Sequence, residues 1–305
     1  MRIILLLFAS SLIVSSCLQV QAQKENSENS NTAQNSYWND GLAEINRYAL
    51  DQVRYGESRQ GDLVQIFVTE DFLINKQVKN ETYTSKNSTR VLKRIETRQF
   101  NTGIYQYNMF SSAFTPMDQV RYPHSLKVSC SSQEWCGTTY SQLNRTKDGY
   151  RHTIHSYFEN EADSESVIKD AISEEELFTR IRLNPASLPQ GEINLIPSQM
   201  VSRFLHLDPK SIKSQASLSQ YAGSDFDGDD LMSYTINSKE LNRTLEIVYE
   251  SSAPHTIVGW TDAYSSYFDK DKRKSIARLT HQSKEAYWRL NQNSDEFKRQ
   301  DLGLD

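Results

Sequence analysis

The sequence predicts a mainly β protein of the α+β class, with one large antiparallel, strongly curved sheet or open half-barrel and a helical insertion. Aromatic content is the first reason, because 16 Tyr and 12 Phe stand against only 11 Gly and 7 Pro, and aromatic residues are enriched in strands. The second reason is that short apolar runs bounded by turn residues recur along the chain. Since hydrophobic residues make up only 37% of the sequence, we expect an economical core.

Residues 61–70, GDLVQIFVTE, give the clearest strand pattern, and the turn-forming stretch 56–61 leads into them. Residues 43–55 fit both a helical and a strand pattern, and we expect a strand because it would enter that turn directly. A hairpin is expected from residues 245–249 and 256–260. The other predicted strands are 90–97, 103–113, 124–130, 135–143, 150–158, 192–206, 231–236, 242–250 and 255–260.

The clearest helix pattern begins at Ser173. Ser173 and Glu176 match a capping box, in which the serine hydroxyl accepts from the Glu176 amide and the Glu176 carboxylate accepts from the Ser173 amide. The helix should end near Leu183, because an Asn-Pro pair follows and the residue before a proline is disfavoured in helical geometry. One or two helical turns over 164–171 would complete a helical insertion near 164–183.

The first 17 residues, MRIILLLFASSLIVSSC, predict a secretory signal followed by a lipoprotein cleavage motif. One basic residue precedes an apolar run that is too short to span a bilayer. The run ends in Val14-Ser15-Ser16-Cys17, which resembles the bacterial lipobox, whose cysteine receives the lipid. We therefore expect lipidation of Cys17. The alternative is cleavage after Ala22 at an A-x-A-like site, which would release a secreted protein.

Residues 18–36, LQVQAQKENSENSNTAQNS, predict a flexible tether. The segment holds almost no apolar residues, so it cannot offset its own ordering entropy, and a coil of that length reaches about 25 Å. Leu18 stands where an Asp commonly retains lipoproteins at the inner membrane, so we expect an outer-membrane lipoprotein that faces the periplasm. Residues 37–305 would then form a single β-rich domain.

Cys130 and Cys136 flank Trp135 and are the two cysteines left once Cys17 is assigned to the membrane. In an oxidising compartment an even number of cysteines favours a disulfide. On one unbroken strand the pair would lie about 20 Å apart, beyond the roughly 4.4 to 6.8 Å Cα separation of a disulfide, so a bond requires a turn at 131–134. Two buried free thiols, or a nucleophilic thiol with a histidine base, are the alternatives.

Two stretches contain residue types that bind metals. Asp225, Asp227 and Asp229 alternate in GSDFDGDD and are a weak calcium candidate, because Ca²⁺ prefers several oxygen ligands. The stretch departs from an EF-hand loop in the place of its glycine and in its twelfth residue. His152 and His155 form an H-x-x-H pattern, but on a strand residues three apart point to opposite faces. We therefore expect no metal and no cofactor.

Common catalytic and nucleotide-binding motifs are absent from the sequence, including G-x-S-x-G, the P-loop, G-x-G-x-x-G and H-E-x-x-H. The formal net charge of −5 is mild, and acidic and basic residues are interspersed. Since there is no basic stripe, RNP-like motif or zinc-finger spacing, we expect no binding to nucleic acid.

Six phrases of the sequence together are similar to a family of uncharacterised envelope lipoproteins of Bacteroidetes-type bacteria. They are RYGE at 54–57, IFVTEDF at 66–72, NTGIYQYNMFSSAFTP at 101–116, SQEWCG at 132–137, HSYFE at 155–159 and IRLNP at 181–185. Some members of that family carry the label "septum formation inhibitor Maf". True Maf proteins resemble cytoplasmic nucleotide pyrophosphatases with a Ser-x-Ser-Pro-Arg-Arg loop, which this sequence lacks. The resemblance therefore implies an envelope location and no particular activity.

These observations favour a lipid-anchored envelope protein that is not an enzyme and that binds a hydrophobic or envelope-derived ligand, or a partner protein, on its curved sheet. The expected contact with the membrane is through the lipid on Cys17. The first alternative is an envelope hydrolase that uses Cys136 or a carboxylate cluster such as Glu70 and Asp71. The second alternative is a purely structural interaction protein.

Overall fold

The computed structural model describes residues 36–266 and 268–304, and the chain divides into two compact units, residues 1–40 and 41–305. In the first unit, residues 36–38 form a helical turn. The expected signal, Cys17 and nearly all of the expected tether 18–36 lie outside the described residues and stay predictions. The sheet and the helices that follow belong to the second unit.

The second unit is built on one 16-stranded curved sheet that does not close, which confirms the predicted fold class. The strand order is β10-β11-β12-β13-β14-β15-β16-β1-β2-β4-β5-β6-β7-β8-β9, and β3 pairs with β2. Only β10 and β11 pair in parallel among the described strands. The strands are β1 (Ala43–Arg54), β2 (Glu57–Leu73), β3 (Val78–Lys79), β4 (Ser88–Thr102), β5 (Tyr105–Pro116), β6 (Lys127–Glu134), β7 (Gly137–Thr146), β8 (Gly149–Ser156), β9 (Ser164–Lys169), β10 (Ile172–Ser173), β11 (Gly191–Ile196), β12 (Ile212–Gln220), β13 (Leu231–Ser238), β14 (Arg243–Glu250), β15 (Ile257–Ser266) and β16 (Asp269–Glu285).

Short hairpins join many of these strands to their neighbours. Between β1 and β2 the turn residues Tyr55 and Gly56 have φ of +56° and +78°, and such a two-residue turn matches the right-handed twist of the strands it joins. Because the strands alternate in direction, the β4–β5, β6–β7 and β8–β9 connections lie at this same end of the sheet, the Tyr55 end. Strand β1 starts at the opposite end, the Ala43 end.

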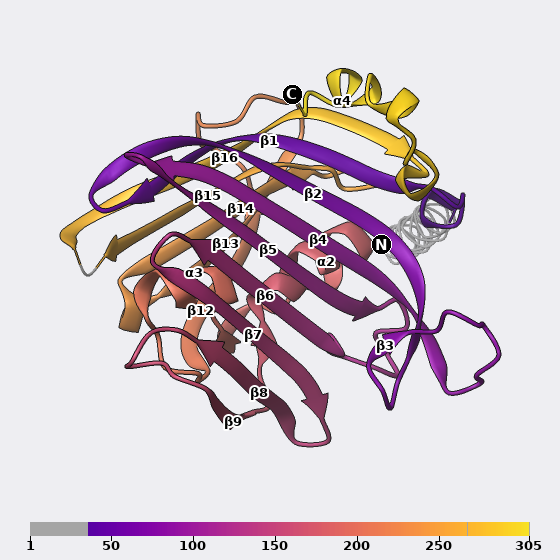
Figure 1. The fold of residues 1–305 in the computed structure, drawn as a ribbon, viewed down its shortest axis with the longest axis horizontal. Coiled ribbons are helices and arrows are strands. Elements are labelled where there is room, and N and C mark those ends of the chain that lie inside the picture. The colour runs from indigo at the N-terminus through magenta and orange to yellow at the C-terminus, as the bar shows by residue number, and fades with distance from the viewer. Residues whose placement is uncertain (1–35, 267, 305) are drawn as a thin grey trace, which may run out of the picture. The chain divides into compact units, whose positions relative to one another are not determined.

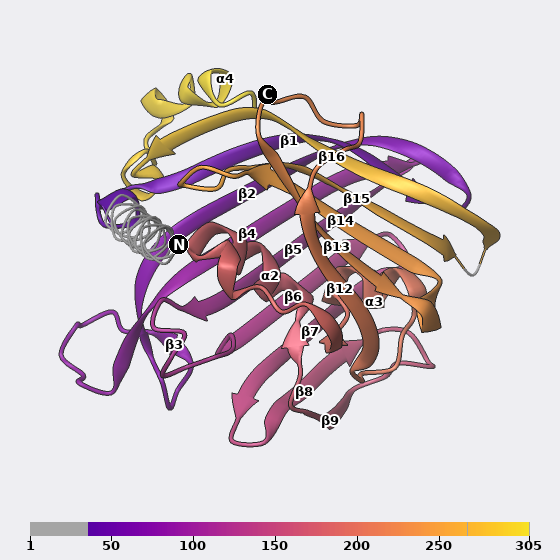
Figure 2. The same cartoon turned by 180° about the vertical axis from the view of Figure 1, so that it is seen from behind.

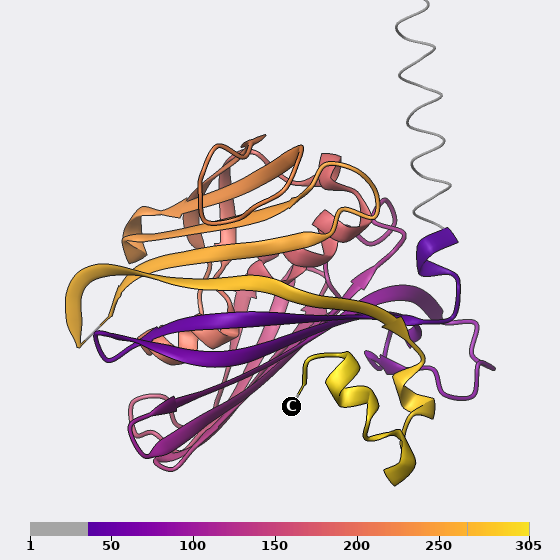
Figure 3. The same cartoon turned by 90° about the horizontal axis from the view of Figure 1, so that it is seen from above.

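Two helices lie inside the curve of the sheet. Figures 1 and 2 show α2 (Glu174–Leu183) and α3 (Gln199–Leu205) between the strands β4–β7 and the strands β12–β14, and Figure 3 shows the same strands from above. Helix α2 contacts β4 and β5, and α3 contacts β5 and β6. The rings of Phe178 on α2 and Trp260 on β15 lie 5.2 Å apart. Helix α2 therefore touches β15 as well as β4 and β5.

The remaining helical segments are short. They are η1 (Pro185–Ser187), η2 (Lys239–Leu241), η3 (Tyr287–Arg289), η4 (Asn293–Asp295) and α4 (Lys298–Asp301). Among the described residues no helix is long and apolar enough to cross a bilayer.

Several predicted elements agree with the structure. Residues 43–54 are a strand, as the turn behind them predicts, and the hairpin of β14 and β15 pairs Ile247 with Trp260. Helix α2 starts after Ser173 and ends at Leu183. The sequence analysis does not predict β12 and β16, in which serine, lysine and glutamine outnumber the apolar residues.

Two predicted elements are wrong. Residues 164–169, expected to be helical, form β9, which pairs along β8. The single strand expected over 192–206 is instead β11 followed by α3. The break falls at Pro197, and the Ser198 hydroxyl then accepts a hydrogen bond from the Met200 amide at 3.3 Å. Ser198 is therefore the N-cap that starts α3.

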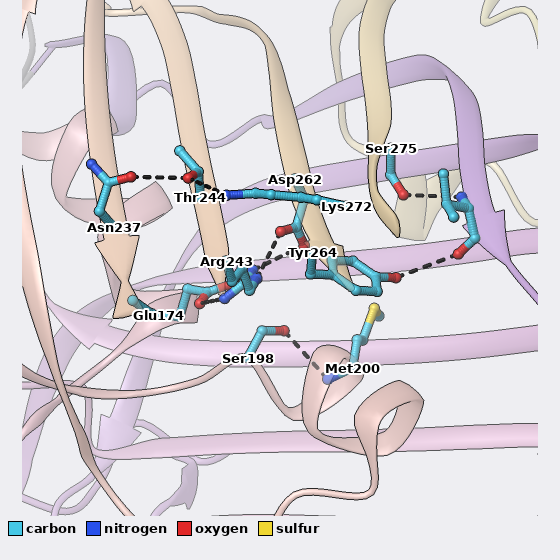
Figure 4. A network of polar contacts seen from close by, with 12 residues as sticks. Glu174, Ser198, Met200, Asn237, Arg243, Thr244, Asp262, Tyr264, Lys272 and Ser275 are labelled. Carbon is cyan, nitrogen blue, oxygen red and sulfur yellow. Dashed lines mark hydrogen bonds and ion pairs between the residues drawn. The ribbon is translucent and has the colours of Figure 1, made fainter. Parts of the chain in front are cut away.

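Buried ion pairs join α2 to the sheet. The three consecutive glutamates of its first turn, Glu174 to Glu176, are all buried. The Nη2 of Arg243 donates to Glu174 at 2.7 Å, and its Nε donates to Asp262 at 2.7 Å, so one guanidinium links α2, β14 and β15 (Figure 4). A buried carboxylate is stable only when it is paired or hydrogen-bonded, so these contacts determine where α2 can lie.

Three further arginines complete this inner network. Arg182 at the end of α2 pairs with the buried Glu44 of β1. On β4, Glu96 lies between Arg94 and Arg98, and the Arg98 Nη2 donates to it at 2.8 Å. The interior of the curved sheet is therefore ionic as well as apolar.

The predicted capping box is wrong in its contacts, although the helix begins where it predicts. Ser173 is the N-cap residue but makes no side-chain cap hydrogen bond. The Glu176 carboxylate accepts from the Ser125 amide at 2.7 Å and from the Arg180 Nε at 2.7 Å. Tertiary partners therefore take the place of the local partner that the capping box supplies.

We expect Arg243→Ala to lower the free energy of unfolding by about 3 to 5 kcal/mol, because it leaves Glu174 and Asp262 buried without their cation. Urea unfolding measures this loss. Lys213→Ala is the control, since Lys213 pairs with Glu192 at the surface and such an exposed pair contributes little to stability. Equal losses in the two variants would contradict the role given to Arg243.

Candidate binding pocket

A pocket of about 360 Å³ lies between the strands β6–β8 and helix α3 with the loop that follows it. Protein sites for small molecules are clefts of roughly 300 to 1,000 Å³. The antiparallel register places Cys130, Ser141 and Ile154 opposite one another on β6, β7 and β8, and all three line the pocket. The pocket is therefore built on a rigid part of the sheet.

Apolar side chains form one part of the lining. They come from β8, β9, β11 and the loop after α3, and they are Ile154, Ile168, Ile196, Pro197 and Leu207. Ile168 and Ile196 also belong to a buried cluster that joins β9 to β11. A ligand with an apolar body would gain free energy by removing this surface from water.

Ion pairs form the opposite part of the lining. The Arg203 Nη2 on α3 donates to Glu134 at 3.0 Å, and its guanidinium lies 4.0 Å from the centre of the Phe158 ring. Glu161 lies 2.7 Å from the His206 Nδ1 and 3.7 Å from the Arg203 Nη1. Burial opposes ionisation of Glu161, yet its hydrogen bonds to His206 and Ser156 hold its pKa below the usual value.

Apart from the exposed Asp208, the charged side chains that line the pocket are paired in the described part of the chain. Arg203 is shared by two carboxylates and His206 is paired with one of them. Lys210 at the rim pairs with Glu240 at 2.6 Å. The pocket therefore suits a ligand that is polar at one part but carries no strong net charge.

His152 supplies a polar group in the wall of the pocket that faces away from solvent. It is only 4% exposed, and its Nδ1 has no hydrogen-bond partner among the described residues. Burial lowers its pKa, while a hydrogen bond with the Gln199 side chain opposes that shift. The imidazole is therefore neutral near pH 7 and offers a ligand one hydrogen-bonding nitrogen.

Glu175 lies behind the pocket, at the junction of the two helices. Its Oε1 accepts a hydrogen bond from the Gln199 amide of α3 at 2.7 Å, and its Oε2 has no partner among the described residues. Unlike the two glutamates beside it, Glu175 forms no ion pair with an arginine in the described part of the chain. Burial raises its pKa to about 7, and the bond from Gln199 only partly opposes this.

A small cavity of about 20 Å³ adjoins Glu175. Its lining includes Arg94, Glu96, Arg243 and Asp262. All four of these charged residues are paired with each other or with a neighbour. Glu175 is therefore the carboxyl group of the network that takes up a proton most readily.

Neither cysteine has the surroundings of a catalytic nucleophile. Cys130 is buried in the pocket wall, and burial raises the pKa of its thiol. Cys136 is exposed, and a hydrogen bond with Glu134 raises the pKa of its thiol. Thiolate reactivity requires the opposite shift. No histidine hydrogen-bonds either thiol among the described residues. The surroundings of the two thiols therefore do not support the hydrolase alternative that uses Cys136.

Cys130 and Cys136 are both free thiols in the structure, not a disulfide. The turn falls at residues 135–136 and not at 131–134, because β6 continues to Glu134. Cys130 thus lies four residues before the end of its strand, about 13 Å along it, whereas Cys136 is in the turn. The predicted disulfide needs the earlier turn and does not form in this geometry.

The metal-site candidates do not gather ligands. No group of three or more His, Cys, Asp or Glu side chains that could hold a metal ion occurs in residues 36–266 and 268–304. Asp225 pairs with Lys274 at 2.6 Å, and Asp227 and Asp229 lie exposed beyond it. His152 is buried while His155 is exposed, as expected for residues three apart on β8.

The carboxylates Glu70 and Asp71 do not form a catalytic cluster. They are neighbours on β2 and therefore point to opposite faces of the sheet. Glu70 pairs with Lys93 at 3.3 Å, and Asp71 accepts a hydrogen bond from Asn80. This geometry does not support the hydrolase alternative that rests on them.

Of the residues that line the pocket, the sequence patterns pointed to Cys130 and His152. They did not point to the residues of α3 and its loop, Gln199, Arg203 and His206. The cause is the wrong assignment of 199–205 to a strand. The sequence does contain a helix signal here. Ser198 after Pro197 is a typical N-cap, and Met200, Val201 and Phe204 follow at helical spacing.

Comparisons with protein-family models, with curated proteins and with solved structures found no match to this chain. The resemblance to envelope lipoproteins therefore stays a prediction from the sequence.

We expect the stability of the protein to depend on the protonation of Glu175. Its folded-state pKa of about 7 lies above the ordinary value of 4.5, so its contribution to stability is full below pH 4.5 and is lost as the pH rises through 7. The shift corresponds to roughly 3 kcal/mol. Urea unfolding between pH 5 and 8 should show this loss in the wild type and not in Glu175→Gln.

Glu57→Gln is the control for this measurement, since Glu57 lies at the surface beside Arg59. Its pH profile should follow that of the wild type. If Glu175→Gln kept the wild-type pH profile, the assignment of the titration to Glu175 would be wrong.

Proposed function

We propose that this chain is a lipid-anchored envelope protein that binds a small amphipathic ligand, without converting it, in the pocket between β6–β8 and α3. The observation that carries the proposal is the pocket itself, with apolar side chains on one part and paired charges on the other. The anchor rests on the sequence motif that ends in Cys17.

The volume of the pocket limits the size of the ligand that it can hold. A volume of about 360 Å³ is near the lower end of the range for small-molecule sites. Helices α2 and α3 and the ion pairs around them fill the rest of the curve of the sheet. A small molecule therefore fits this proposal better than a large lipid.

The exposed tips of the hairpins favour a second candidate, docking of a partner protein. Four large apolar side chains lie at the Tyr55 end of the sheet, where they are 57% to 87% exposed, and contiguous exposed apolar surface often marks a binding site. They are Ile104, Trp135, Tyr157 and Phe268. A protein that only docks a partner is not expected to bind a small apolar probe in the pocket. Binding of such a probe therefore separates ligand binding from partner docking.

We expect the uncharged fluorescent probe N-phenyl-1-naphthylamine to bind the wild type, and Ser202→Trp to weaken this binding at least about tenfold. Ser202 lines the pocket from α3, so the indole would occupy the space of the ligand. Ser217→Trp, at an exposed position of β12, is the matched control and should bind as the wild type does. Equal binding by both variants would contradict the proposal.

Mass spectrometry of the mature chain tests the anchor. We expect the chain to begin at Cys17 and to carry the added mass of its acyl groups. A free thiol at Cys17, or a chain that begins at Gln23, would remove the anchor from the proposal but would leave the pocket untouched.

A further inference from the structure

A second concavity, separate from the pocket, lies at the Ala43 end of the sheet. It has a volume of about 480 Å³ and forms where three segments meet, residues 74–77 after β2, residues 121–126 before β6 and residues 145–147 at the end of β7. We call it the basic cleft, because its charged lining residues are Arg121, Arg145 and Lys147 together with His124.

The charge of this cleft is unlike that of the chain. The formal net charge of the protein is −5, yet no Asp or Glu is among the residues that line the cleft. Arg121 and Lys147 have no acidic partner within ion-pair distance in the described part of the chain. Arg145 is partly neutralised, because its Nη1 lies 2.6 Å from Asp170. Positive charge is therefore left over in the cleft.

His124 lies between two acidic groups that face it from outside the cleft. Its Nε2 is 3.7 Å from Asp170, and its Nδ1 is 3.6 Å from Glu176. Glu176 is already paired with Arg180. The excess positive charge of the cleft therefore comes mainly from the arginines and the lysine.

Each of the two arginines lies against an aromatic ring. The Arg145 guanidinium lies 5.1 Å from the centre of the Tyr150 ring, and the Arg121 guanidinium lies 5.3 Å from that of Tyr122. The Arg145 amide donates a hydrogen bond to the Leu126 carbonyl at 2.8 Å, which joins two of the three segments that form the cleft. Contacts of this kind lower the entropy cost of ordering the two side chains when a ligand binds.

We propose that the basic cleft binds a phosphate ester. A guanidinium presents paired N–H donors that match two phosphate oxygens, and an ammonium adds a mobile point charge. The volume exceeds what a bare phosphate fills, so the Tyr122 ring and the Asn75 amide are left to contact the rest of the ligand.

The same phosphate chemistry has two sources, a soluble phosphate ester and the headgroup of an anionic lipid. The position of the cleft at the Ala43 end of the sheet is a reason to test the lipid headgroup. Strand β1, the first strand that follows the expected tether in the sequence, starts at Ala43 at the same end of the sheet, and basic side chains close to a bilayer are attracted to anionic lipids. The cleft does not depend on the pocket, so either proposal can fail alone.

The test uses the full chain with Cys17→Ser, so that no acyl chain contributes to membrane binding. One arm titrates glycerol 1-phosphate by calorimetry at low salt. The other arm measures co-sedimentation with phosphatidylglycerol vesicles, with phosphatidylcholine vesicles as the uncharged comparison. We expect binding in at least one arm, and weaker binding as the salt concentration rises.

The double variant Arg121→Glu/Lys147→Glu should weaken that binding at least tenfold. Both side chains are exposed, so the variant should unfold at the temperature of the wild type. Lys239→Glu changes charge at the Tyr55 end and should bind as the wild type does. Binding of glycerol 1-phosphate alone would identify a soluble ligand, and binding of vesicles alone would identify a headgroup. No binding in either arm, or equal weakening by Lys239→Glu, would overturn the proposal.

Discussion

The ion pair of Arg243 with Glu174 and Asp262 is the contact on which the rest of the structure depends. It fixes the first turn of α2 against two strands that lie far from it in the sequence. Charges buried in this way are costly unless each one has a partner, so α2 has one well-defined position inside the curve of the sheet. The position of α2 in turn determines that of α3, through the hydrogen bond from the Gln199 amide to Glu175.

This packing limits what the curved sheet can bind. A sheet of this curvature could enclose a long apolar cavity, but here two helices and their ion pairs occupy the space. What is left beside α3 is a pocket of about 360 Å³ whose charged side chains, apart from Asp208, are already paired. The sequence alone allows a hydrophobic ligand of any size. The packing inside the sheet favours a small amphipathic ligand instead.

The sequence predicted those parts of the fold that depend on local patterns. Examples are the hairpin at 245–260 and the end of α2 before the Asn-Pro pair. It did not predict that Glu174 to Glu176 are buried, because three acidic residues in the first turn of a helix are also typical of a solvated surface. Arg243, the partner of Glu174, is 69 residues away from it, and no local pattern connects the two. The pocket was missed for a similar reason, since it depends on the position of α3.

A crystal structure of the protein grown with 1-bromonaphthalene would test most directly whether the pocket beside α3 is the binding site. Bromine gives an anomalous signal that locates the probe without reference to the fold. We predict a peak in the pocket between Ile154, His152 and Arg203. A peak between α2 and β4, where the ion pairs should leave no room, would contradict it.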